Sequence, residues 1–171
     1  MKTTGFTNTL AAIVLAVGSG TALAAPPTGS NEMSVAGTYA DVEDTNLTAL
    51  QLTYGYYIDP MHEVGVGGSF VKFEVEDEFD LDGSWLSAFY NLNFPTSGVM
   101  QPYLGVNVAT IGGDLGDAYD FAYGASAGIK FYPFENAGIL VSFNYQKFQA
   151  ADDFFDDSDA TSLNVGLLIR F

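Results

Sequence analysis

The stretch of sequence that decides the fold is Leu163-Asn164-Val165-Gly166-Leu167-Leu168-Ile169-Arg170-Phe171. Every odd-numbered residue in it is bulky and apolar, whereas the even-numbered residues are polar or small, apart from one leucine. Because successive side chains of a β-strand point to opposite faces, this stretch predicts a strand with one wholly apolar face. Two structures accommodate such a strand: a soluble fold that buries the apolar face, and a membrane barrel that turns it toward lipid.

The same alternation continues through most of the chain. It marks eight segments of about the 9 to 11 residues that a tilted membrane strand requires. These segments are 32–40, 47–58, 63–73, 85–94, 101–111, 119–131, 137–148 and 161–171. In each segment one face is bulky and the other is small or polar. The pattern predicts an all-β fold, an eight-stranded antiparallel up-and-down transmembrane β-barrel.

Alternation alone does not say which face points inward. A lipocalin-like soluble barrel would turn the bulky face toward a ligand and expose glycine, serine and asparagine to water. Aromatic residues near the segment ends favour the lipid-facing interpretation, because membrane barrels carry aromatic girdles at both interfaces. One predicted girdle comprises Tyr56, Phe94, Phe131, Tyr132, Phe134 and Phe171, and the other comprises Trp85, Tyr119, Phe121, Tyr145 and Phe148.

The first 24 residues have the features of a secretory signal peptide. Lys2 supplies a positive charge, residues 10–17 are apolar, and Ala22-Leu23-Ala24 is a small-x-small cleavage site. The apolar stretch is far shorter than the roughly 20 residues of a membrane-spanning helix. We therefore expect residues 1–24 to be a cleaved signal peptide and residues 25–171 to form one domain.

Composition excludes several classes of function. The sequence has no cysteine, so disulfides and zinc-thiolate sites are ruled out. After cleavage, four basic residues stand against 21 acidic ones, a net charge of −17. Such a chain has no basic patch that would bind nucleic acid. Yet 48% of the residues are hydrophobic, which excludes a disordered acidic chain.

The connections between the segments indicate which end of the barrel faces the periplasm and which faces the cell surface. Those after the second, fourth and sixth segments are short and rich in turn-forming residues, at 59–61, 95–98 and 133–136. The other connections, counted together with Asp120 at the start of the sixth segment, hold 17 of the 21 acidic residues. We expect the short turns to face the periplasm and the acidic connections to face the cell surface.

A family resemblance rests on several motifs. Gly166, Ile169 and Phe171 form Gly-x-x-Ile-x-Phe, which resembles the C-terminal signal by which bacterial outer-membrane barrels are recognised for insertion. Gln101-Pro102-Tyr103-Leu104-Gly105-Val106 and Gly128-Ile129-Lys130-Phe131-Tyr132 are typical of the strands of such barrels. From about residue 32 to 171 the chain resembles the small eight-stranded barrels: the opacity-protein type, the transmembrane domain of outer membrane protein A, and the generic outer-membrane β-barrel domain family.

This resemblance implies a place in the bacterial cell outer membrane. It implies contact with outer-membrane lipid and lipopolysaccharide, and insertion by the barrel assembly machinery. In the outer membrane protein A family a peptidoglycan-binding domain follows the barrel. The present chain stops at Phe171, so that wall-anchoring role is not expected.

Four charged residues are expected on the inward face. The strand registers place Glu32, Glu63, Lys130 and Arg170 in the lumen near the periplasmic rim. One interpretation is a selectivity or gating cluster, and the other is an ion-pair network that fills the barrel. The interior of an eight-stranded barrel is just wide enough for its side chains, which favours the ion-pair network.

The acidic connections are candidates for diffuse binding of Ca²⁺ or Mg²⁺, since hard cations prefer oxygen ligands. The residues in question are Glu78, Asp80, Asp82, Asp152, Asp153, Asp156 and Asp157. The spacing from Glu78 to Gly83 resembles half of an EF-hand loop, but the twelfth position is Phe89 instead of the required glutamate. The alternative is a solvated, self-repelling acidic surface. No tightly held cofactor is expected.

Two lysines are expected on the outer face of the barrel. Lys72 and Lys147 lie near the acidic rim, where their side chains would reach toward lipid headgroups. They are candidate contacts for lipopolysaccharide phosphates, or else ordinary interfacial lysines.

The sequence does not predict an enzyme. His62, the single histidine, lies beside a predicted periplasmic turn with no evident nucleophile. We expect a structural or surface role, with acidic loops that meet cations or a surface partner of unknown identity. A narrow passive, porin-like channel is the alternative, followed by a soluble lipocalin-like barrel.

Overall fold

A computed structural model of the chain describes residues 26–42, 45–75, 79–151 and 157–171. The predicted signal peptide, residues 1–24, lies outside the described residues and remains a prediction. Among the described residues, no helix is long and apolar enough to cross a membrane.

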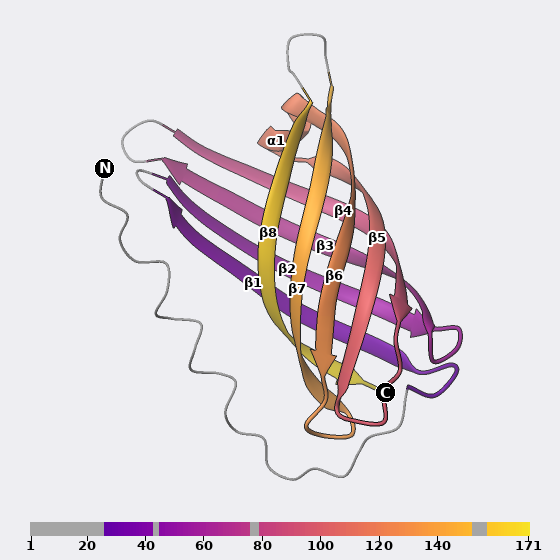
Figure 1. Ribbon diagram of the computed structural model, residues 1–171. Coiled ribbons are helices and arrows are strands. Elements are labelled where there is room, and N and C mark those ends of the chain that lie inside the picture. Colours follow the sequence, from indigo (N-terminus) through magenta and orange to yellow (C-terminus); the bar gives the residue numbers. More distant parts are fainter. Residues whose placement is uncertain (1–25, 43–44, 76–78, 152–156) are drawn as a thin grey trace.

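Eight strands and one short helix make up the described structure (Figure 1). They are β1 (Asn31–Val42), β2 (Thr45–Tyr57), β3 (His62–Val75), β4 (Phe79–Asn93), β5 (Met100–Gly112), α1 (Asp114–Ala118), β6 (Tyr119–Phe131), β7 (Ala137–Ala150) and β8 (Ser158–Arg170). Each strand pairs antiparallel with the next, and β8 pairs with β1 to close the barrel. The predicted fold class, an all-β eight-stranded up-and-down barrel, is confirmed.

Several strands extend further into the acidic connections than predicted. β4 begins at Phe79 instead of residue 85, and its pairing with β3 continues to Val75 opposite Phe79. Asp80 and Asp82 therefore lie in a strand, and their predicted place in a loop is wrong. Backbone hydrogen bonds hold an antiparallel hairpin together whatever the side chains are, so pairing continues where the apolar pattern has ended.

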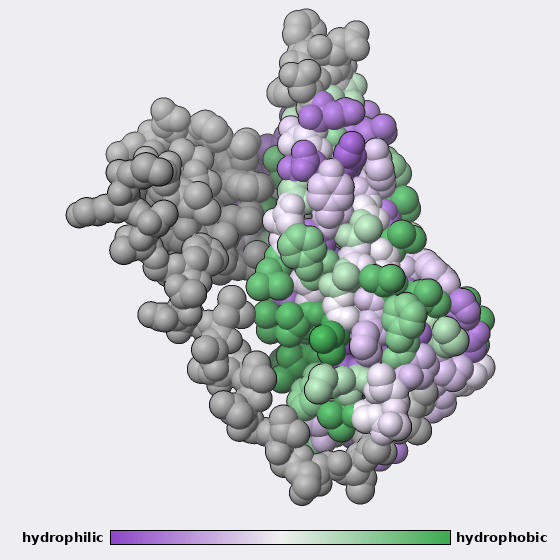
Figure 2. Space-filling model, viewed as in Figure 1, coloured by the Kyte–Doolittle hydropathy of each residue, from purple (hydrophilic) through white to green (hydrophobic). Residues whose placement is uncertain are grey.

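The bulky face of every strand points outward. Each strand carries exposed large hydrophobic side chains, among them Met33, Leu52, Val66, Leu86, Val106, Ile129, Phe143 and Leu167. In β8, Leu163, Leu167 and Ile169 are exposed, whereas Leu168 and Arg170 are buried. Figure 2 shows hydrophobic side chains on the flank of the barrel and hydrophilic ones gathered at the end where α1 lies. A lipocalin-like interior lined by the bulky face is therefore wrong for this barrel.

Glycines on the inward face of the strands leave room for bulky side chains of neighbouring strands. An ideal Cβ on Gly65 would lie 2.3 Å from the backbone oxygen of Tyr54 and 2.3 Å from Cζ of Phe89. Phe89 is the cross-strand partner of Gly65, and its inward ring occupies the space that a side chain at residue 65 would take. On the outer face of the same strand, a Cβ on Gly68 would meet nothing within 4 Å.

Candidate functional site

A charged cluster occupies the end of the lumen where the chain enters β1 and leaves β8. It contains Glu32, Glu63, Lys130 and Arg170, whose relative exposures are 4%, 2%, 2% and 7%. The register brings Glu32 directly opposite Arg170 across the β1–β8 seam. Glu63 on β3 and Lys130 on β6 reach in from other parts of the wall. The structure thus brings together the four charged residues that alternation placed in the lumen.

Lys130 is the centre of this lumen cluster. Its Nζ donates hydrogen bonds to Glu32 Oε1 at 2.6 Å, to Glu63 Oε2 at 2.7 Å and to the Tyr57 hydroxyl at 2.9 Å. A lysine ammonium has three N–H donors, so all three have acceptors here. Charge-assisted hydrogen bonds of this length are the strong kind. A single buried cation therefore ties β1, β2, β3 and β6 together.

Each carboxylate also has neutral donors. Glu32 Oε2 accepts hydrogen bonds from the Tyr57 hydroxyl at 3.1 Å and from the Tyr132 hydroxyl. Glu63 Oε2 accepts hydrogen bonds from the side-chain amides of Asn91 at 3.0 Å and Asn93 at 3.2 Å. These donors satisfy carboxylate oxygens that have left water, which a buried ion pair needs in order to be stable.

Arg170 completes the charge balance. Its Nη2 lies 3.7 Å from Glu32 Oε2 and donates to Gln101 Oε1 at 3.3 Å. Its guanidinium carbon lies 3.8 Å from the centroid of the Tyr132 ring, in cation–π contact. Burial and the neighbouring Glu32 carboxylate raise the pKa of the Tyr132 phenol, so it remains a hydrogen-bond donor. Two carboxylates and two cations give the lumen cluster no net charge.

Sequence reasoning missed the neutral half of the lumen cluster. Tyr132 was predicted in an aromatic girdle, but it is buried against Arg170 and Glu32, so that prediction is wrong. Tyr57 is fully buried, while its neighbour Tyr56 is exposed. A signal for this existed, since adjacent residues of a strand face opposite sides and one of two consecutive tyrosines must point inward.

The second predicted girdle is also wrong for three residues. Trp85, Tyr119 and Phe148 line the lumen instead of the outer surface. The ring of Phe148 lies 6.2 Å from that of Trp85 and 5.7 Å from that of Tyr119, between centroids. For Trp85 the alternation itself indicates an inward position, because the exposed residues of β4 are the even-numbered ones. Near Tyr119 a register shift between β6 and β7 breaks the alternation.

The candidate cation ligands are only partly described. Glu78, Asp152, Asp153 and Asp156 lie outside the described residues. Asp82 and Asp157 are exposed, and an Oδ1 of Asp157 accepts a hydrogen bond from the Ala150 backbone at 3.2 Å. The described residues contain no group of three or more histidine, cysteine or acidic residues placed to hold a metal ion. Cation binding stays a prediction.

Lys72 and Lys147 are both exposed on the outer face. Their cross-strand neighbours are aspartates, Asp82 for Lys72 and Asp159 for Lys147. His62 Nδ1 lies 2.6 Å from the Tyr90 hydroxyl. The His62 and Tyr90 rings lie 5.9 Å apart between centroids.

Comparison with solved structures supports the fold. Neisserial surface protein A aligns with a TM-score of 0.62 and 17% identity, covering 83% of this chain and 96% of that one. The N-terminal β-barrel domain of OprF from Pseudomonas aeruginosa aligns with a TM-score of 0.59 and 16% identity, over 84% and 98%. The outer membrane protein Ail of Yersinia pestis gives 0.52 and 18%, over 84% and 99%. The chain has the fold of these barrels. Neither a protein-family model nor a curated protein sequence matches it.

Proposed function

We propose that this chain is a bacterial outer-membrane β-barrel with a structural or surface role. The observation that carries the proposal is the outward face, where every one of the eight strands exposes large apolar side chains. Soluble proteins rarely expose continuous apolar surface of this extent, whereas a lipid-facing barrel requires it. The charged residues that remain within the described strands gather inside the barrel or near the α1 end. Similarity in fold to Neisserial surface protein A and Ail supports the same conclusion.

A substitution on the outer face tests the lipid environment. Val106 lies near the middle of β5 and is 57% exposed, so Val106→Arg places a charge near the bilayer midplane. In a membrane this costs about 2–4 kcal/mol. On the surface of a water-soluble barrel it changes stability by less than about 0.5 kcal/mol. Ser97→Arg, in an exposed turn, is the control and is expected to be neutral.

Cell fractionation accompanies this measurement. The wild-type protein is expected in the outer-membrane fraction, with the heat-dependent gel mobility of a folded barrel. Recovery of the protein in the soluble periplasmic fraction, together with a neutral Val106→Arg variant, would contradict the proposal.

The lumen cluster supports a structural role over a channel. Four charged side chains and two tyrosines meet across the lumen with direct hydrogen bonds, where the interior of an eight-stranded barrel is already narrow. We therefore expect no stepwise conductance from purified protein in planar bilayers. Discrete, reproducible conductance steps that change in size with Lys130→Met would instead favour the channel.

The surface role rests on the acidic connections and the two outer lysines. Lys72 and Lys147 at the rim would bind lipopolysaccharide phosphates, while divalent cations would bridge the acidic loops to neighbouring lipopolysaccharide. The Lys72→Ala, Lys147→Ala variant is expected to copurify with less lipopolysaccharide than wild type. Gln149→Ala, an exposed position on the same strand as Lys147, is the control. Full retention by the double variant would remove the lysines from the proposal.

A further inference from the structure

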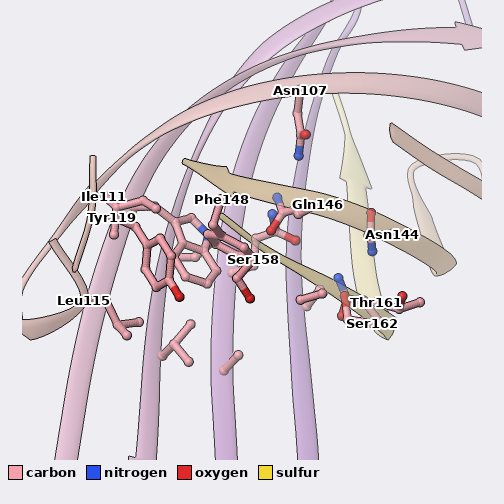
Figure 3. Close-up of a pocket in the computed structure, with 18 residues that line it drawn as sticks. Asn107, Ile111, Leu115, Tyr119, Asn144, Gln146, Phe148, Ser158, Thr161 and Ser162 are labelled. Atoms are coloured by element: carbon pink, nitrogen blue, oxygen red, sulfur yellow. The ribbon is translucent and has the colours of Figure 1, made fainter. Parts of the chain in front are cut away.

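The lumen contains a cavity of about 310 Å³ on the α1 side of the charged cluster (Figure 3). We call this space the upper cavity, and it is large enough for several water molecules. Its volume falls at the lower end of the range for small-molecule sites. The charged cluster closes the lumen below it, so the upper cavity is a cup and not part of a continuous pore.

The upper cavity opens beside β8. Ser158 and Ala160 occupy inward positions of β8, yet both are exposed. Within the described residues, β1 and β8 pair only from Glu32 opposite Arg170 to Gly37 opposite Val165. The remaining upper part of β8 is paired with β7 alone. The upper cavity is therefore partly open beside the upper part of β8.

The wall of the upper cavity is mostly apolar, and the polar groups in it are uncharged. Five side-chain amides line it, those of Gln51, Asn107, Asn144, Gln146 and Asn164, with hydroxyl groups between them. No acidic or basic residue is among the described residues that line it. Because each amide carries both donors and an acceptor, this wall suits a neutral ligand rich in hydroxyl groups. A charged ligand would lose water and gain no counter-charge.

Two buried polar atoms at this wall have no hydrogen-bond partner. They are Ser69 Oγ and Asn107 Oδ1. Ser69 is 4% exposed and is one of the residues that line the upper cavity. Both oxygens have almost no accessible surface, so a ligand in the upper cavity reaches them only if the side chains rotate toward it.

An aromatic surface faces the amides. Figure 3 shows Tyr119 and Phe148, with Ile111 and Leu115, gathered on one side of the upper cavity, and Asn107, Asn144 and Gln146 on the other. Trp85 packs against Phe148 in the same group. The face of an aromatic ring is electron-rich and apolar, so it attracts the slightly positive C–H groups of a partly apolar ligand. A pyranose ring presents C–H groups on its face and hydroxyl groups around its edge.

We propose that the upper cavity binds a neutral sugar of one or two rings, with a C–H face on the aromatic group and hydroxyl groups on the amides. This inference is independent of the outer-membrane assignment, since it depends only on the lumen.

Trp85 is the single tryptophan of the chain and lines the upper cavity, so its fluorescence reports binding directly. The protein is refolded in a detergent without a sugar headgroup, such as an amine oxide, because a glycoside detergent would compete. N-acetylglucosamine, glucose and maltose are then titrated. A saturable fluorescence change is expected with at least one of them, and glucuronate, which is charged, is expected to bind at least tenfold more weakly.

Two variants locate the site. Asn107→Leu removes amide hydrogen bonds and is expected to weaken binding about tenfold or more. Ala49→Phe fills the upper cavity from β2 and is expected to abolish saturation. Val108→Ala, beside Asn107 but on the outer face, is the control and keeps wild-type affinity. Heat-dependent gel mobility verifies folding, and Ser69→Ala replaces any variant that fails this check.

Absence of a saturable change with all three sugars at 100 mM would overturn the proposal and leave a water-filled lumen. Binding that survives both Asn107→Leu and Ala49→Phe would equally overturn it, because the sugar would then lie elsewhere.

Discussion

Removing the ammonium group of Lys130 tests how much the lumen cluster stabilises the folded barrel. Lys130→Met keeps an unbranched side chain one atom shorter than lysine and deletes three hydrogen bonds of 2.6, 2.7 and 2.9 Å. Among the described residues, Glu63 then retains the amides of Asn91 and Asn93 and no ion-pair partner. Glu32 retains two phenols and Arg170, whose Nη2 lies 3.7 Å away. The loss of Lys130 therefore affects Glu63 more than Glu32.

The expected cost is about 3–5 kcal/mol in the free energy of unfolding, the usual result of breaking a buried pair and leaving one charge unpaired. The assay is urea unfolding in lipid vesicles, followed by Trp85 fluorescence and by gel mobility. Lys147→Met is the matched control, because Lys147 lies exposed on the outer face. Its effect is expected to stay within about 0.5 kcal/mol.

A double variant separates charge balance from packing. In Lys130→Met with Glu63→Gln, the lumen cluster keeps one carboxylate and one guanidinium, and its net charge returns to zero. We expect the double variant to be more stable than Lys130→Met alone by at least about 1 kcal/mol, because no unpaired carboxylate remains buried. If Lys130→Met unfolds within about 1 kcal/mol of wild type, or if the double variant is no more stable than the single one, the reasoning is wrong.

The remaining predictions concern packing, insertion and orientation. Gly65→Ala is expected to destabilise the barrel by about 1–3 kcal/mol in urea unfolding, since the new methyl group meets an aromatic ring and a backbone oxygen. Gly68→Ala is the control, because a methyl group there meets open space. Equal effects of the two substitutions would contradict the packing described. Deletion of Phe171, or Phe171→Asp, is expected to lower the yield of protein in the outer membrane and leave protease-sensitive periplasmic material. Unchanged assembly of both variants would contradict a role of the terminal strand in insertion. A cysteine at Ser158 is expected to react with an impermeant label on intact cells and one at Ser97 is not; the reverse pattern would invert the orientation.

The alternation of apolar and polar residues predicted much of this structure, because an extended strand fixes the direction of each side chain. Once a segment is extended, neighbouring side chains must point to opposite faces of the strand. A one-residue slip in pairing would therefore turn all the apolar side chains inward. The inward position of Glu63 and Lys130 follows from the exposed residues beside them, Val64 and Ile129. For the same reason, the inward positions of Tyr57 and Trp85 follow from the alternation in their strands, although Trp85 was predicted in a girdle.

Other features had no local signal. Helix α1 lies in an acidic connection whose composition indicates only a loop. Tyr119 faces the lumen beside a register shift between Tyr119 and Phe121, which no alternation rule predicts. The start of β4 at Phe79 depends on pairing with β3, and hence on a partner strand instead of on its own side chains.

The sequence by itself determined the number of strands, their order and the face of most residues, because the period of two and the turn residues are local properties of the chain. Only the tertiary structure decided which inward side chains meet. Lys130 contacts residues that are 98, 73 and 67 positions away in the chain, and those contacts depend on the tilt and stagger of strands on opposite walls of a closed barrel. The same tilt and stagger gather side chains from different strands around the upper cavity. A pattern within one strand cannot encode a distance across the lumen.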